Sequence, residues 1–201
     1  MDAMARYYGE IPTDQVEKLC RYHLLISEWN TKVNLISRKD IENFWSKHII
    51  PCLSINKVVR FKPEASVVDV GTGGGLPGIP LAIANGGTNF TLVDSIGKKA
   101  LAVDDMAKKL ALKRVKVRNS RVEEVAEKFD YIVARAVANL TDFLKNVSGL
   151  CKKDTQIFYI RGSDFGGELQ GISNFYVHNI GKLLDDDDFA DKVIVEIRNE
   201  K

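Results

Sequence analysis

The chain has few residues of the kinds that bind metals or form disulfides. Only three of its 201 residues are cysteines, at positions 20, 52 and 151, and only three are histidines. The cysteines are far apart and form no CxxC pair, which argues against a disulfide framework and against a zinc site. Reduced thiols in the cytoplasm fit this usage best. We therefore expect no metal in the functional site.

Long apolar runs are also missing. No stretch approaches the roughly 20 apolar residues of a membrane-spanning helix, and the first 15 residues lack the apolar core of a signal peptide. We expect a cytoplasmic protein without membrane contact, and nothing in the sequence demands more than a monomer. Hydrophobic residues make up 45% of the chain and charged residues 28%, so a packed fold is expected rather than disorder. The length suits one well-cored domain.

Positive charge is concentrated in one segment although the net charge is only +2. Residues 98–121 contain nine basic and two acidic side chains, so this segment carries +7 and the rest of the chain −5. Such a surface can meet phosphate groups. A solvated helix face and loop would have the same composition, and the sequence alone leaves both interpretations open.

Two hydrophobic periodicities divide the chain. Apolar residues recur at spacings of three and four over 13–33 and 40–50, which predicts two amphipathic helices, the second limited by Pro51. From residue 66 onward the chain shows short runs typical of strands. The predicted strands are 67–70, 90–93, 115–117, 131–133, 156–160, 174–179 and 192–198. Helical stretches separate the first five at about 77–85, 97–112, 121–127 and 139–150, and we expect no helix between the last two strands.

This alternation indicates a doubly wound α/β fold. Strands linked by helices form right-handed crossovers and a parallel sheet covered on both faces. The last two strands would form a hairpin-like edge of the sheet, for which an antiparallel orientation is an option. We predict a helical extension over 1–60 that faces the substrate and a ligand-binding domain over 61–201, packed together as one compact unit.

A glycine-rich turn follows the first predicted strand. Residues 67–80 read VVDVGTGGGLPGIP, so a buried strand leads into a glycine turn and then a helix. Ligands of open α/β sheets bind at the carboxyl ends of the strands, and glycines there permit positive φ and a close approach of the ligand to the backbone. A turn with this many glycines is poorly explained without a ligand.

Several cofactors can use such a turn. Gly73, Gly75 and Gly78 satisfy GxGxxG, and Asp94 follows Gly75 by 19 residues, so a dinucleotide is formally possible. Asp69 argues against it, because a carboxylate there would repel a pyrophosphate but could attract a sulfonium or amino group. Asp94 can accept both hydroxyls of a ribose or cap the helix that follows it. We favour S-adenosylmethionine as the cofactor and ribose binding as the role of Asp94.

Longer stretches of the sequence carry a resemblance to a known family. They are Trp29-Asn30 with Val33-Asn34-Leu35, Lys47-His48-Ile49, residues 69–80, residues 92–95 with Lys98, residues 120–124, and residues 134–138 with Leu140. Together they resemble the bacterial ribosomal small-subunit methyltransferase G family, also called GidB. D-x-G-x-G is common to many methyltransferases, whereas GLPGIP followed by ARAVA is far more specific.

The resemblance implies a fold, an activity and a partner. The fold would be the Rossmann-like, seven-stranded fold of S-adenosylmethionine-dependent methyltransferases with an N-terminal helical extension. The activity would be methylation of N7 of one guanine in a 16S rRNA hairpin near the decoding centre. The partner would be 16S rRNA or the small ribosomal subunit.

The resemblance also implies roles for individual residues. Gly71, Gly73 and Leu76 would line the cofactor, Asp94 would bind its ribose, Val122 and Glu123 would flank its adenine, and Arg121, Arg161 and Lys192 would contact RNA. Arg135 would lie beside the cofactor and position the substrate, with no general base in the reaction. An arginine after a buried strand independently favours this crevice, and a structural ion pair is the alternative. His48 would belong to the site or only fix the N-terminal helices.

Three places in the chain depart from the family pattern. The first is the pair Pro51-Cys52 in place of the usual Asp-Ser, so four residues are involved; Arg161 stands where lysine is common, and Lys192 stands where arginine is more usual. These departures leave the cofactor residues untouched and concern the substrate side. Without the resemblance, the residues leave open a methyltransferase of another substrate class or a non-catalytic nucleotide- or RNA-binding module.

Overall fold

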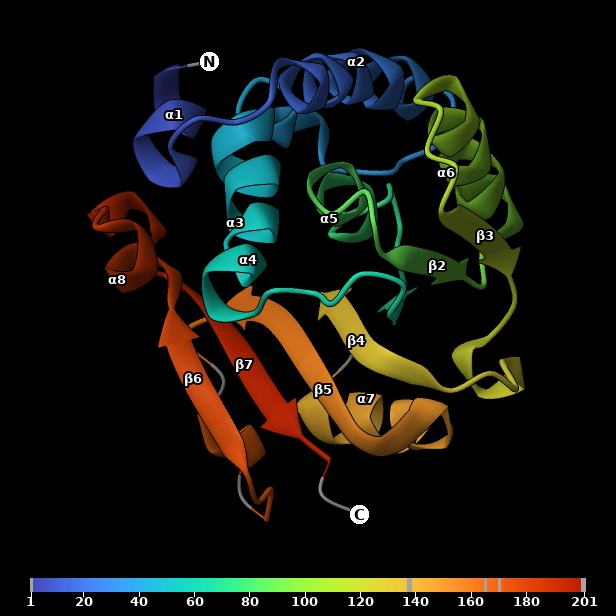
Figure 1. The fold of residues 1–201 in the computed structure, drawn as a ribbon, viewed down its shortest axis with the longest axis vertical. Coiled ribbons are helices and arrows are strands. Elements are labelled where there is room, and N and C mark those ends of the chain that lie inside the picture. Colours follow the sequence, from blue (N-terminus) through green and yellow to red (C-terminus); the bar gives the residue numbers. More distant parts are fainter. Residues whose placement is uncertain (1, 137–138, 165, 170, 200–201) are drawn as a thin grey trace.

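A seven-stranded sheet runs through the computed structural model, which describes residues 2–136, 139–164, 166–169 and 171–199 (Figure 1). The strands are β1 (Ser66–Val70), β2 (Asn89–Asp94), β3 (Val115–Asn119), β4 (Phe129–Arg135), β5 (Cys151–Gly162), β6 (Phe175–Asn179) and β7 (Lys192–Arg198). Their order is β3-β2-β1-β4-β5-β7-β6. The first five strands are parallel, and β7 is antiparallel to both β5 and β6. The predicted α/β fold is confirmed.

Helices connect and cover these strands. The α-helices are α1 (Asp2–Tyr8), α2 (Thr13–Asn30), α3 (Ile50–Leu53), α4 (Ile55–Val58), α5 (Gly78–Ala84), α6 (Gly97–Lys109), α7 (Leu140–Val147) and α8 (Ile180–Leu184). Five short 3-10 turns are η1 (Arg38–Asp40), η3 (Val122–Glu124), η4 (Ser148–Leu150), η5 (Gly166–Leu169) and η6 (Asp187–Phe189). One π-helical segment, η2 (Trp45–Ile49), precedes α3.

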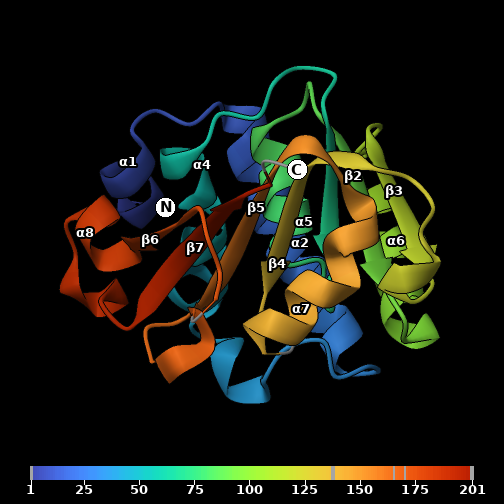
Figure 2. The same cartoon turned by 90° about the horizontal axis from the view of Figure 1, so that it is seen from below.

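Alternate side chains of the strands enter two hydrophobic cores. Val67 and Val133 face the core formed with α2, α5 and α6, whereas Val68 and Ile132 face the core formed with α7. This alternation follows from the two-residue period of a strand. The cover is unequal: α1 to α6 lie on one side of the sheet and α7 lies on the other (Figures 1 and 2). The N-terminal helices share the first core with the sheet, and the division at residue 60 stays a prediction.

The helical path of the N-terminal layer continues past Pro51. The π-helical segment η2 leads directly into α3, which contains Pro51 in its first turn, and α4 follows. Proline is tolerated in the first turn of a helix because its missing N–H is not required there. The prediction that Pro51 limits this helix was wrong.

Two other predictions about helices were also wrong. The stretch 121–127 forms only the three-residue turn η3, and α8 lies between β6 and β7, where no helix was expected. In α8, Ile180 and Leu184 are buried. A helix of five residues contributes only one such pair, which is too short a pattern to identify from sequence.

Candidate active site

The carboxyl ends of four parallel strands meet at one edge of the sheet. Val70 of β1 pairs with Val93 of β2 and with Ala134 of β4, and Asp94 pairs with Asn119 of β3. This register brings the glycine loop (residues 71–75), the end of β2, the turn η3 and the end of β4 to the same edge. The edge, called the ligand edge below, therefore holds the principal residues predicted from sequence.

The glycine loop has a packed inner side and an open outer side. Gly71, Gly73 and Gly75 have φ values of 69°, 58° and 94°, a region that glycine adopts without strain. A Cβ added at Gly75 would lie 2.5 Å from the side chain of Ile79, whereas one added at Gly73 would meet nothing closer than 3.9 Å. Gly73 therefore presents bare backbone on the side where a ligand can approach.

The N-terminal layer supports this loop from the inner side. The buried hydroxyl of Tyr22 donates a hydrogen bond to the carbonyl oxygen of Gly74 at 2.7 Å. The side-chain oxygen of Asn30 accepts from the N–H groups of Leu35 and Ile36 at 2.8 and 3.0 Å, which fixes the segment packed against Gly74. These two supports were not predicted from the sequence. Tyr22 fits the apolar stripe of its helix, and the stripe does not show that its hydroxyl donates a hydrogen bond to the glycine loop.

Asp69 lies fully buried beneath the glycine loop. Its Oδ2 accepts from the Thr72 hydroxyl at 2.6 Å and from the N–H of Gly78 at 2.8 Å. Among the described residues, none forms a hydrogen bond with its buried Oδ1. Burial raises the pKa of Asp69 to about 7. Asp69, the residue that argued against a pyrophosphate, therefore has one carboxylate oxygen that accepts no hydrogen bond from the described residues.

Asp94 joins the end of β2 to the glycine loop. Its Oδ2 accepts from the N–H of Gly73 at 2.9 Å, and its Oδ1 accepts from the N–H of Ile96 at 2.8 Å. It does not cap α6 in the usual way, since Ile96 occupies the cap position and no side chain bonds there. Each carboxylate oxygen retains a second lone pair. Ribose binding by Asp94 therefore stays a prediction that its placement permits.

The remaining predicted cofactor residues lie around the same edge. Leu76 is buried at the end of the glycine loop. Val122 is half-buried in η3, and Glu123 beside it is exposed. Arg121 is exposed at the start of this turn. Their contacts with adenine and RNA stay predictions.

Arg135 reaches from the end of β4 to the N-terminal layer. Its Nη2 donates to the Lys47 carbonyl oxygen at 2.8 Å and its Nη1 to the His48 carbonyl oxygen at 3.4 Å. The Sγ of Cys52 lies 3.7 Å from Nη1. No carboxylate of the described residues forms an ion pair with it, so the alternative of a structural ion pair is not observed there. Val137 and Ala138, which complete the ARAVA stretch, lie outside the described residues.

His48 is buried beside these carbonyl groups. Neither ring nitrogen has a hydrogen-bond partner among the residues that the structure describes, and Nε2 lies 3.9 Å from Oδ2 of Asp40. Burial lowers the pKa of His48 to about 3, and the nearby charges of Arg135 and Lys47 act in the same direction. His48 is therefore neutral at physiological pH, and its ring packs against Phe44.

Arg161 and Lys192 lie at the ligand edge but are engaged in ion pairs. Arg161 donates to both carboxylate oxygens of Glu168, at 2.6 and 2.9 Å. Glu168 also accepts from the N–H of Leu140 at the start of α7 at 3.0 Å. Lys192 pairs with Gly162 in the sheet and donates to Asp191 at 2.7 Å. Their predicted contacts with RNA would require these pairs to be shared or opened.

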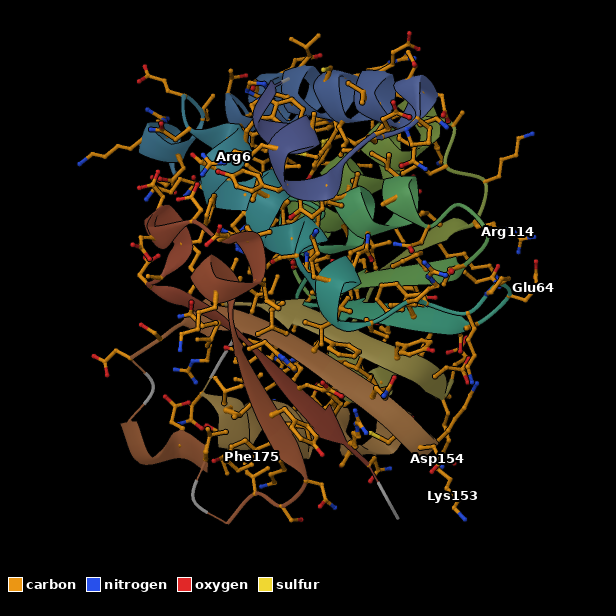
Figure 3. All side chains as sticks on the ribbon, turned by 60° about the vertical axis from the view of Figure 1, so that its left-hand side comes forward. Arg6, Glu64, Arg114, Lys153, Asp154 and Phe175 are labelled. Carbon is orange, nitrogen blue, oxygen red and sulfur yellow. The ribbon has the colours of Figure 1, made fainter. Side chains whose placement is uncertain are left out.

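The basic segment 98–121 does not form one patch. Lys98 lies in the first turn of α6 at the ligand edge, whereas Lys108 and Lys109 end that helix, about 16 Å away. Four of the nine basic residues form ion pairs, which are Lys108–Asp104, Lys109–Asp105, Arg114–Glu64 and Arg118–Glu127. Figure 3 shows Arg114 and Glu64 together at the rim of the molecule. Only part of the charge seen in the sequence faces the ligand edge.

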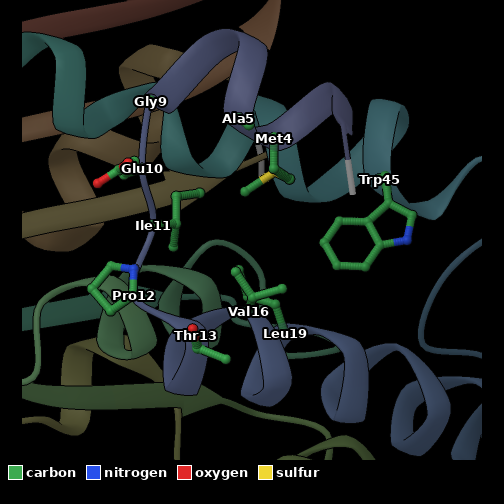
Figure 4. A pocket seen from close by; sticks show the side chains of 10 residues that line it. All are labelled: Met4, Ala5, Gly9, Glu10, Ile11, Pro12, Thr13, Val16, Leu19 and Trp45. Atoms are coloured by element: carbon green, nitrogen blue, oxygen red, sulfur yellow. The ribbon is translucent and has the colours of Figure 1, made fainter.

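A separate cavity lies in the N-terminal layer. It has a volume of about 690 Å³ and opens between α1, α2 and η2 (Figure 4). Met4, Ile11, Val16, Leu19 and Trp45 are among the residues that line it. No residue of the glycine loop contributes to it, and its mainly apolar lining offers no group for the predicted chemistry.

The described parts of the chain contain no group of three or more His, Cys, Asp and Glu side chains placed to hold a metal ion. No helix within those parts combines the length and apolar character needed to cross a membrane.

The order and directions of the strands define a Rossmann-like α/β fold. Solved structures share this fold. A SAM-dependent methyltransferase from Aquifex aeolicus superposes with a TM-score of 0.62 at 19% identity, covering 87% of this chain and 98% of that one. A ribosomal protein L11 methylase from Lactobacillus delbrueckii gives a TM-score of 0.54 at 20% identity, covering 76% and 77%.

The sequence defines the family within this fold. The chain belongs to the rRNA small subunit methyltransferase G family, GidB, whose model matches residues 15–179. A relative from Flavobacterium johnsoniae is 38% identical over 98% of this chain and 97% of its own length. One from Parabacteroides distasonis is 44% identical over 85% and 77%. Both are named ribosomal RNA small subunit methyltransferase G.

Proposed function

We propose that this protein transfers a methyl group from S-adenosylmethionine to N7 of one guanine in 16S rRNA, in the hairpin near the decoding centre. The observation that carries the proposal is the family match over residues 15–179, together with relatives of nearly equal length. The substrate would be 16S rRNA or the small ribosomal subunit. Since ribosomal RNA is made and assembled in the cytoplasm, we propose that the enzyme acts there.

The residues at the ligand edge fit the cofactor. The open backbone at Gly73 can accommodate a close ligand, and the fully buried Asp69 would support the turn from below through its hydrogen bonds with Thr72 and Gly78. Asp94 would hold the ribose hydroxyls because both of its oxygens are already oriented by backbone N–H groups. Val122 and Glu123 would border the adenine. S-adenosylmethionine, when bound, supplies a methyl group on a sulfonium that a ring nitrogen can attack in line.

The side chains need to position the reactants rather than move protons. Guanine N7 carries a lone pair and no proton, so the reaction requires no general base. This agrees with the edge itself, where His48 is neutral and enclosed. The glycine loop and Asp94 would fix one reactant, and Arg135 would orient the other through its guanidinium. Catalysis by orientation and fixed charge is sufficient for such a displacement.

Arg135 is suited to this task because its charge is not neutralised by a described carboxylate. Its oxygen acceptors among the described residues are main-chain carbonyl groups, which hold a guanidinium without cancelling its charge. A planar guanidinium can contact a phosphate or the edge of a guanine. The target base must also leave its stack, or be unstacked already, to present N7.

The test is transfer of a tritiated methyl group from S-adenosylmethionine to 16S rRNA and to small subunits that lack the modification. Label at a single guanine N7, located by mapping, is the expected result. Cofactor binding without label in any ribosomal RNA would refute the proposed substrate. A failure to bind the cofactor would refute the proposed activity as a whole.

A further inference from the structure

Pro51 and Arg135 are linked through one carbonyl group. In an α-helix the carbonyl of residue 47 would accept from the N–H of residue 51. Residue 51 is proline and has no N–H, and the chain forms the π-helical segment η2 before α3 begins. The Lys47 carbonyl instead accepts from Nη2 of Arg135 at 2.8 Å. Arg135 thus supplies the donor that Pro51 lacks.

We propose that Pro51 is a positioning residue that holds the guanidinium of Arg135 at the ligand edge by leaving the Lys47 carbonyl open to it. The inference rests on the proposed function for its effect on catalysis, but the contact itself belongs to the fold. Pro51 is buried, so its ring is fixed by the surrounding core.

The arrangement has an electrostatic consequence. An aspartate at position 51 could pair with Arg135 and offset its charge, whereas the carbonyl oxygens orient the guanidinium and leave its full charge for an anionic ligand.

Cys52 also contacts the guanidinium of Arg135, but this contact is not the one that orients it. Its thiol is fully buried, and burial raises its pKa to about 11, so it is uncharged at neutral pH. Its contact with Nη1, at 3.7 Å, is weak compared with the Lys47 contact. Cys52→Ser is therefore a matched control that leaves the Lys47 carbonyl unchanged.

The experiment is a double-mutant cycle with Pro51→Ala and Arg135→Lys in the full-length protein. Alanine at position 51 restores the N–H that competes for the Lys47 carbonyl. We expect Pro51→Ala to lower kcat/KM for 16S rRNA by about 3- to 10-fold, the effect of one hydrogen bond. In the Arg135→Lys background it should cause less than a twofold further change. Pro63→Ala, at an exposed proline remote from the site, controls for proline removal.

A second measurement follows the guanidinium without using activity. In the wild type the Nη protons of Arg135 should give resolved, slowly rotating NMR signals, and these should average in Pro51→Ala but persist in Cys52→Ser. Equal losses of kcat/KM in both backgrounds, or unchanged Nη signals in Pro51→Ala, would overturn the inference. If the wild type transfers no methyl group to ribosomal RNA, the proposed function fails, and the NMR comparison alone decides whether Pro51 positions Arg135.

Discussion

Arg135 combines a fixed orientation with a charge that no described carboxylate pairs with. Two carbonyl groups of the N-terminal layer hold it, and it follows directly from a buried strand that ends at the ligand edge. We expect Arg135→Ala to lower kcat/KM for rRNA about 10- to 100-fold, since a charged hydrogen bond contributes about 1.5–3 kcal/mol. Methyl transfer measured alongside thermal melting checks this. Unchanged activity in a folded variant would contradict the assigned role.

Asp69 predicts a pH dependence of stability in the ligand-free protein. Burial raises its pKa from 3.8 to about 7, so between these values the folded protein retains a proton that the unfolded chain has lost. The contribution of Asp69 to the free energy of unfolding therefore falls as pH rises from about 4 to 7 and stays low above. A pKa difference of one corresponds to about 1.4 kcal/mol.

Asp69→Asn tests this dependence. The amide keeps an acceptor for Thr72 and Gly78 and removes the ionisation. We expect the variant to melt at a higher temperature than the wild type at pH 8 and at a similar temperature at pH 4. Thermal melting across this range is the measurement. If the wild type melts at a higher temperature than the variant at pH 8, the ionised Asp69 does not lower the free energy of unfolding, and the prediction is wrong.

At the scale of elements, Glu168 of η5 connects this turn to β5 and α7 through hydrogen bonds. It accepts from Arg161 of β5 and from the N–H of Leu140 at the start of α7. The hydrogen bond from Arg161 is the largest cause, and with the one from Leu140 it lowers the pKa of Glu168 to about 2. Since this lies below its ordinary value of 4.5, the stabilisation is complete above about pH 4.5 and is lost as pH falls toward 2.

Glu168→Gln should therefore lower the melting temperature at pH 7, and the difference from the wild type should shrink as pH approaches 2. Glu127→Gln is the matched control, because Glu127 forms an exposed pair with Arg118 and such pairs contribute little. Melting curves of both variants at pH 7 and at low pH provide the comparison. An equal effect of the two substitutions at pH 7 would contradict a special role for the α7 contact.

The strands and the glycine loop could be predicted from sequence because their signals are local. The predicted strand 192–198 coincides with β7, and the predicted 67–70 differs from β1 by one residue. The glycine loop is readable because positive φ requires a particular residue type. These signals need no knowledge of distant parts of the chain.

Features that depend on distant contacts could not be predicted. The Tyr22 hydroxyl reaches a carbonyl 52 residues away, and the donor for the Lys47 carbonyl comes from 88 residues away. The helical path through Pro51 was also missed, because proline is tolerated in the first turn of a helix and the sequence does not show where that turn begins. The candidate site residues were predicted from the glycine motif and from the resemblance, while the hydrogen bonds that orient them required the structure.

At the scale of the whole molecule, the position of charge is more informative than its sum. The segment 98–121 carries +7 in sequence, yet its residues lie at both ends of α6 and β3, and several are already paired. The exposed side chains of Lys98 and Arg121 belong to the ligand edge, and those of Lys108 and Lys113 lie toward the opposite edge. RNA bound at the active site should therefore sense only the first pair.

Two double variants with the same loss of charge separate location from sum. Lys98→Ala/Arg121→Ala should weaken rRNA binding and reduce the slope of log affinity against log salt by about 1 to 2, since each lost phosphate contact removes about 0.7 to 0.9. Lys108→Ala/Lys113→Ala should leave the slope within about 0.5 of the wild type. Binding measured from low to moderate salt gives both slopes. Two variants of identical net charge can differ in this slope only if RNA contacts one of the two sites directly. Equal reductions of the slope would therefore mean that RNA responds to the overall electrostatic field of the protein.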